Sequence, residues 1–199
     1  MKNKFPYTFI LLCSILIFSS CESEVEKKQR EAKEEQQGIE LEARLEKEHQ
    51  EKVIHDKYIN NSLSTGDTPY PYCFGTNQSC TNWGCAGITV KTPNNSDVLV
   101  TIKKNDNVVR HAYIAAGNTY KFEFPNGTYQ AFFYYGKGWN PNKNMKELEC
   151  DVLKGGFVAD ELFSKDAPQS LENSILSYEL ILQQTGNFST RPSNSDEAF

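Results

Sequence analysis

Alternating hydrophobic and polar positions between residues 97 and 135 give the clearest structural signal in this chain. Every second residue is hydrophobic in residues 98–102 and again in residues 120–124. A period of two is typical of a strand with one buried face. Residue types that favour tight turns lie between the hydrophobic runs, at 105–107, 117–118 and 126–127. The pattern therefore predicts four strands joined by three hairpin turns, an antiparallel meander.

The last strand of this meander, residues 128–135, is the most aromatic stretch of the chain. Its aromatic residues point in two directions: Tyr129, Phe133 and Tyr135 toward one face, Phe132 and Tyr134 toward the other. We therefore expect both faces of this strand to be covered, or one of them to carry a functional patch.

Other segments complete a mainly β domain. Residues 87–92 read as a strand before the meander, and residues 174–183 as a late strand whose hairpin partner is 188–190. We expect a polar loop and a helical turn through Met145 and Leu148. The tail from residue 191 onward is expected to be loose, with packing of Phe199 against the domain as the alternative. The total of about seven strands predicts an antiparallel β-sandwich preceded by an N-terminal charged helical stalk.

The stalk is predicted from composition. Residues 22–58 are dominated by Glu, Lys, Gln and Arg, with no proline and one glycine, Gly38. Val25, Ala32, Ile39 and Val53 fall on a seven-residue spacing that would suit a coiled coil, but Glu46 interrupts the row. A solvated helix is therefore favoured, with an oligomerising coil or a disordered tether as alternatives.

Turn-rich sequence follows the stalk and divides the chain. Asn-Asn-Ser at 60–62 and two prolines at 69 and 71 are linker chemistry. We therefore expect three parts, listed here as a signal peptide (residues 1–20), a charged tether (residues 21–60) and a folded domain (residues 61–199).

The first residues have the layout of an export signal. Lys2 and Lys4 precede an apolar run at residues 9–18, which ends in Ser-Ser-Cys at Cys21. The run is too short for a permanent membrane span. These residues resemble the lipobox of bacterial lipoproteins, which implies that Cys21 is lipidated with acyl chains such as palmitate and becomes the first residue. The alternative is an ordinary signal peptide cleaved near Ser20.

Charge and motif content limit the classes of function that the sequence supports. The net charge of −5 and pI near 5.3 give no basic footprint for nucleic acid. His49, His55 and His111 have no metal-binding spacing, so we expect them on the surface. Asp160, Glu161 and Asp166 are close in sequence and are predicted to form a solvated acidic loop. No catalytic motif is present in the sequence, so we predict a protein that is not an enzyme and has no metal or cofactor.

Four cysteines remain after the N-terminal segment: Cys73, Cys80, Cys85 and Cys150. Export favours disulfides over a zinc site, and the paired spacing of a zinc ribbon is missing. We expect at least one bridge to involve Cys150. A partner at Cys80 or Cys85 would close a loop of about 65 to 70 residues and contribute about 4 kcal/mol in the chain-entropy model.

Aromatic residues beside glycine-rich loops are the candidates for ligand contact. They are Trp83, Tyr134, Tyr135 and Trp139. Most of these rings are expected to pack in the core, and Trp139 is the best candidate for exposure. Exposed flat rings on a β-domain stack on sugars or anchor a protein partner.

Three motifs carry a resemblance over residues 85–199. They are Lys-Asn-Asp-Asn-Val-Val-Arg at 104–110, Phe-Pro-Asn-Gly-Thr-Tyr at 124–129 and Gly-Gly-Phe-Val-Ala-Asp-Glu at 155–161. They resemble a recurring uncharacterised bacterial β-sandwich module, which implies a non-catalytic extracytoplasmic domain.

Two functions follow as hypotheses. The first is a lipid-anchored cell-envelope protein, on the outer membrane by preference, that acts as an interaction or structural module with an envelope protein partner. The second is a carbohydrate-binding module that holds glycan at the cell surface.

Overall fold

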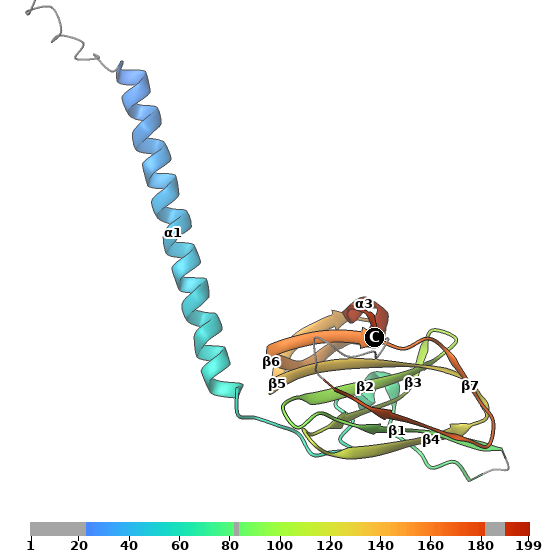
Figure 1. The fold of residues 1–199 in the computed structure, drawn as a ribbon. Helices are drawn as coiled ribbons and strands as arrows, with labels where there is room; N and C mark the ends of the chain where they lie inside the picture. Colours follow the sequence, from blue (N-terminus) through green and yellow to red (C-terminus); the bar gives the residue numbers. More distant parts are fainter. Residues whose placement is uncertain (1–22, 82–83, 182–189) are drawn as a thin grey trace, which may run out of the picture. The chain divides into compact units, whose positions relative to one another are not determined.

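The computed structural model describes residues 23–81, 84–181 and 190–199 (Figure 1). Cys21, Trp83 and most of the expected hairpin partner at 188–190 lie outside the described residues. Contacts divide the chain into two compact units, one ending at His49 and one running from Gln50 to Phe199. In the described ranges, none of the helices has the length and apolar character needed to cross a membrane.

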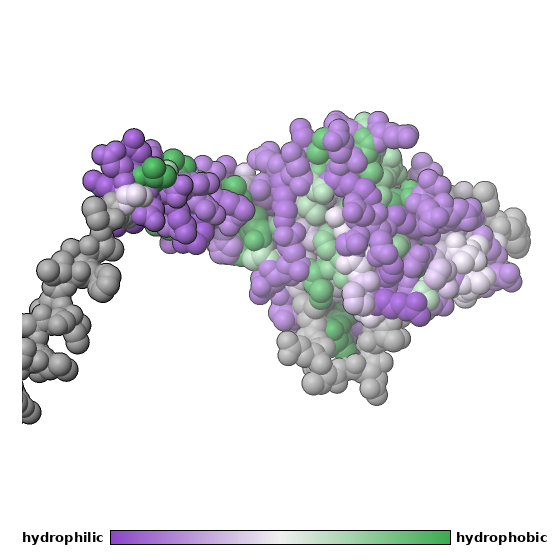
Figure 2. Space-filling view, turned by 90° about the horizontal axis from the view of Figure 1, so that it is seen from above, coloured by the Kyte–Doolittle hydropathy of each residue, from purple (hydrophilic) through white to green (hydrophobic). Residues whose placement is uncertain are grey.

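The predicted stalk is a single helix, α1 (Glu24–Tyr58), and none of its residues is buried. Ser23 and Glu26 form a reciprocal capping box, because the Ser23 hydroxyl accepts the Glu26 N–H and the Glu26 carboxylate accepts the Ser23 N–H. The Ser23 N–H, followed by the Ser23 hydroxyl, donates to the Glu26 carboxylate and lowers the pKa of Glu26. Figure 2 shows hydrophilic residues over most of the visible helix. The helix therefore forms from local propensity and capping, since it has no buried face.

The described part of the second unit is mainly β and contains two sheets. A three-stranded sheet has the order β4-β1-β8, and a six-stranded sheet has the order β3-β2-β5-β6-β9 with β7 paired to β5. The strands are β1 (Cys85–Lys91), β2 (Asp97–Lys104), β3 (Asn107–Ile114), β4 (Thr119–Pro125), β5 (Gly127–Glu147), β6 (Val152–Lys165), β7 (Gln169–Leu171), β8 (Ile175–Glu179) and β9 (Arg191–Pro192). Short α2 (Pro71–Phe74) and α3 (Ser195–Ala198) complete the elements.

The predicted meander is wrong, although its four strands and three chain reversals are present. Among these four strands, only β2 and β3 form a hairpin pair, because β4 leaves that sheet and pairs with β1. The chain then returns, and β5 pairs with β2. The late strand β8 is confirmed, but it runs parallel to β1, so pairing is not antiparallel throughout. Turn chemistry identifies reversals of the chain, whereas the pairing partner of each strand depends on distant residues.

One hydrophobic cluster lies between the two sheets. Ile88 of β1 and Phe122 of β4 belong to it, and so do Val100 of β2 and Phe133 of β5. The rings of Phe133 and Tyr178 meet edge to face, with 5.2 Å between centroids, which joins β5 to β8 across the cluster. This face of the six-stranded sheet is called the inner face below.

The opposite face of the six-stranded sheet, called the outer face below, carries a second cluster. Tyr113, Tyr134, Trp139 and Phe157 lie in it, together with Tyr70 and the C-terminal Ala198 and Phe199. Its cover is therefore two short helices and irregular backbone rather than a second sheet. The expectation that both faces of residues 128–135 are covered is confirmed, because Phe133 and Tyr135 lie in the first cluster and Phe132 and Tyr134 in the second.

Two segments differ from the sequence-based expectation. The predicted helical turn is wrong: Met145 lies within β5 and Leu148 follows that strand. The tail is not loose, since residues 191–192 pair with β6 and Ala198 is only 1% exposed. Both segments are mainly polar in sequence. Their few hydrophobic side chains contact residues that lie far away in the chain, so no local pattern indicates that these side chains are buried.

Candidate functional site

The three aromatic ligand candidates that the structure describes are buried, so the expected exposure of Trp139 is wrong, while the expected core packing of most of these rings is confirmed for Tyr134 and Tyr135. Trp139 is only 2% exposed, and Tyr134 and Tyr135 are also buried. A Cβ at Gly155 would lie 2.5 Å from the Trp139 indole, so the missing side chain at Gly155 makes room for the ring. The glycines near Trp139 thus permit close packing rather than exposure. Trp83 lies outside the described residues.

The Tyr134 hydroxyl joins two strands at the edge of the outer-face cluster. It accepts the N–H of Phe157 at 3.0 Å and donates to the carboxylate of Glu161. Lys143 forms an ion pair with that carboxylate at 2.6 Å. Burial, followed by the Glu161 carboxylate, raises the pKa of Tyr134 well above its ordinary value. The phenol therefore stays protonated and serves as a structural bridge, not as a nucleophile.

His111 is fully buried, so its predicted surface location is wrong. Its Nε2 accepts the backbone N–H of Tyr70 at 3.1 Å. The imidazole stacks on the Tyr70 ring and meets Phe74 edge to face. Burial lowers the pKa of His111 to about 4, against the opposing effect of the Thr68 backbone. The neutral ring is thus part of the outer-face packing.

The four cysteines form two disulfides. Cys73 pairs with Cys150, and Cys80 pairs with Cys85. The expected involvement of Cys150 is confirmed, but the expected partner was wrong. Cys73 lies in α2, which belongs to the cover of the outer face, so its bridge ties that cover to the loop after β5. Spacing along the chain could not distinguish Cys73 from Cys80 or Cys85.

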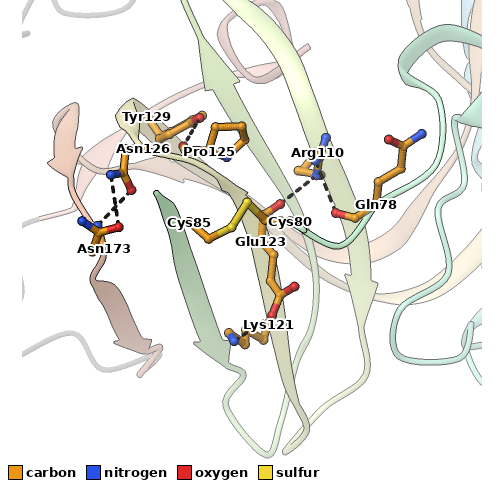
Figure 3. Close-up of a disulfide and its surroundings, with 10 residues drawn as sticks. All are labelled: Gln78, Cys80, Cys85, Arg110, Lys121, Glu123, Pro125, Asn126, Tyr129 and Asn173. Carbon is orange, nitrogen blue, oxygen red and sulfur yellow. Dashed lines mark hydrogen bonds and ion pairs between the residues drawn. A yellow bond between two sulfur atoms is a disulfide. The ribbon is translucent and has the colours of Figure 1, made fainter. Parts of the chain in front are cut away.

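A small cavity lies beside the Cys80–Cys85 disulfide, at the starts of β1 and β8 and along the middle of β4. Figure 3 shows the disulfide and the residues around it. Its volume is ≈ 200 Å³, and Lys121, Glu123 and Ile175 contribute to its lining. Lys121 and Glu123 form an ion pair at 2.8 Å, while Ile175 is 58% exposed. Ligand pockets for small molecules usually measure about 300–1,000 Å³. This cavity is therefore smaller than most small-molecule pockets.

The surroundings of this cavity are held by polar contacts visible in Figure 3. Asn126 and Asn173 exchange hydrogen bonds, with the Asn173 N–H donating to the Asn126 side chain at 2.9 Å. Arg110 donates to the backbone carbonyl of Glu123 at 3.1 Å. These contacts fix the ends of β4 and the segment before β8. The cavity, missed in the sequence, has no local signal because its residues come from three separate strands.

The acidic residues singled out in the sequence are separated and paired. Asp160 forms an ion pair with Lys137 at 2.8 Å, and Asp166 accepts a hydrogen bond from the Tyr178 hydroxyl at 2.7 Å. Asp160 and Glu161 lie within β6, so the predicted acidic loop is wrong for these two residues. Among the described residues, no group of His, Cys, Asp and Glu side chains is arranged to hold a metal ion.

Comparison with known proteins gives no relative. No protein-family model matches the chain, and no significant match is found among curated proteins or solved structures. The resemblances to the bacterial lipobox and to a β-sandwich module therefore stay predictions.

Proposed function

We propose that this protein is a lipid-anchored component of a bacterial cell envelope, in which a β-sandwich domain carried behind a helical tether binds a protein partner. The observation that carries the extracytoplasmic part is the pair of disulfides in the described domain. Disulfides persist in oxidising compartments and are rare in the cytosol. An apolar segment ending at Cys21 precedes the charged helix, as expected of an exported and acylated chain.

The anchor is tested by mass spectrometry of the mature N-terminus from membranes. We expect the chain to begin at Cys21 with acyl chains attached, and a Cys21→Ser variant to leave the membrane fraction. An unmodified Cys21, or a chain that begins elsewhere, would contradict the anchor.

The interaction role is supported by the cavity beside Cys80–Cys85. Its exposed apolar rim residue Ile175 lies next to the Lys121–Glu123 ion pair, and the disulfide braces its wall. An exposed aliphatic residue within a charged rim on a braced surface is a feature of protein interfaces. We therefore assign the partner contact to this face of the three-stranded sheet.

Crosslinking on intact cells followed by affinity capture tests this role. We expect one dominant envelope protein with the wild-type chain, and at least tenfold less of it with Ile175→Asp. Leu162→Asp is the matched control, because Leu162 is 50% exposed on β6 of the other sheet. Capture of polysaccharide alone would instead favour the carbohydrate-binding alternative. That alternative has no support from Tyr134, Tyr135 or Trp139, whose rings are buried.

A further inference from the structure

Residues 194–199 pack against the outer face of the six-stranded sheet and the Tyr70 segment. The surface that these residues cover is called the groove below. Phe199 is 7% exposed. Its ring meets Tyr70, Tyr134 and Phe163 edge to face, with centroid distances of 5.4, 6.4 and 6.2 Å. An aromatic side chain enclosed by three other rings is the kind of anchor that dominates peptide recognition.

Cationic side chains from three strands meet the acidic turn that precedes Phe199. Lys146 donates to the backbone carbonyl of Asp196 at 2.8 Å. Lys165 forms an ion pair with the Glu197 carboxylate at 2.5 Å. Lys103, which is buried, donates to the Glu197 carbonyl. The groove therefore offers positive charge where the segment has carboxylates and unpaired helix carbonyls.

The tail has little backbone pairing with the rest of the domain. Strand β9 contains two residues, and the Ser193 N–H adds one bond to the Phe163 carbonyl at 3.2 Å. Beyond Ser193, the turn is stabilised from within, since the Asn194 side chain accepts the Glu197 N–H at 3.0 Å. Side chains of the groove supply the other contacts, including the Thr101 hydroxyl on the Ala198 carbonyl at 2.9 Å. This arrangement is that of a short helical peptide docked in a groove.

We propose that this groove is a peptide-binding site for a partner segment with two acidic residues in a helical turn, followed by a small residue and an aromatic one. The chain's own residues 194–199 occupy the groove and compete with the partner. This site is separate from the contact proposed at Ile175, and the inference goes beyond that contact by assigning a second binding site to the domain. A tethered competitor has an effective concentration on the order of millimolar, so the partner gains access only when the tail undocks.

Fluorescence anisotropy with a labelled synthetic peptide of residues 191–199 tests the proposal on the full chain. Phe199→Ala removes the internal anchor, so we expect this variant to bind the peptide at least ten times more tightly than the wild type. Adding Lys146→Ala should weaken binding at least fivefold and reduce its salt dependence. Lys154→Ala is the matched control, because Lys154 is an exposed lysine of β6.

Three results would overturn the proposal. The first is a folded Phe199→Ala variant that binds no peptide. The second is equal binding of the 191–199 peptide and of the same peptide ending in alanine. The third is a dimer in sedimentation, because a second copy of the chain would then be the occupant. If Phe199→Ala does not fold, amide exchange in the wild type decides. Faster exchange at Ala198 and Phe199 than in β5 supports undocking, and equal rates exclude it. If a partner is captured through Ile175 but the peptide does not bind, the groove proposal is wrong and the proposed function is still supported.

Discussion

The two faces of the six-stranded sheet are covered by different kinds of structure. The inner face packs on a second sheet through side chains that are mostly hydrocarbon, such as Ile88, Val100 and Phe122. The outer face is covered by two short helices and irregular backbone, and it carries buried groups that need partners, among them His111 and the hydroxyl of Tyr70. The Tyr70 hydroxyl, for example, donates to the Gly155 carbonyl at 2.6 Å.

Because of this difference, the two faces should differ in how far their contribution to stability depends on pH and redox state. Apolar burial depends little on pH or redox state, whereas a neutral histidine, a disulfide and buried hydroxyls each respond to solution conditions. The outer face also holds the docked tail. We therefore expect perturbations of the inner face to weaken the whole domain, and perturbations of the outer face to be selective.

The largest effect is expected from Phe133→Ala on the inner face. Phe133 is fully buried, and loss of its ring should destabilise the domain by about 3–5 kcal/mol through lost burial and a cavity. Chemical denaturation measures this change. Leu162→Ala, at a half-exposed position, is the control and should cost much less; equal costs would contradict the assignment of the core.

Loss of the Cys73–Cys150 disulfide should come next. The two residues are 77 apart in sequence, so the chain-entropy model gives about 4 kcal/mol for this bridge. Cys80 and Cys85 are 5 apart, and the same model gives about 2 kcal/mol. Thermal unfolding of the two double alanine variants makes the comparison. A larger loss from the shorter loop would argue against the view that the first bridge holds the outer-face cover.

His111 should make the stability of the outer face depend on pH. Its pKa is about 4 when folded, below the ordinary value of 6.5, because burial disfavours the charged ring. The unfolded chain therefore binds more protons, so stability is full above pH 6.5 and falls as pH drops toward 4. The loss is about 3 kcal/mol at most. Denaturation across this range should show the slope in the wild type and lose it in His111→Gln, whereas identical slopes would exclude His111 as the cause.

The smallest effect is expected from Tyr134→Phe. The change leaves the ring in place but removes the acceptor of the buried Phe157 N–H, which should cost about 1–3 kcal/mol. Tyr72→Phe is the matched control. Its hydroxyl also accepts a backbone N–H of β6, that of Lys154, but Tyr72 is exposed and water can replace the hydroxyl. Equal costs, measured by urea denaturation, would mean that burial of the hydroxyl has no role.

Much of the secondary structure was predictable from local pattern. The helix of the stalk was predictable, because its residues have high helix propensity and include no proline. The strands at residues 98–102 and 120–124 were also predictable, because a period of two is visible from neighbouring residues alone. The candidate sites were not, since the cavity beside Ile175 and the groove around Phe199 each combine strands distant in sequence.

By itself, the sequence determined the mainly β character, the charged helix and the participation of Cys150 in a disulfide. Only the tertiary structure decided that β4 pairs with β1, that Cys150 pairs with Cys73 and that Trp139 is buried over Gly155. The physical reason is the same in each case. Alternation shows that one side of a strand is buried, but strand partners, covering segments and disulfide partners depend on contacts between residues far apart in the chain.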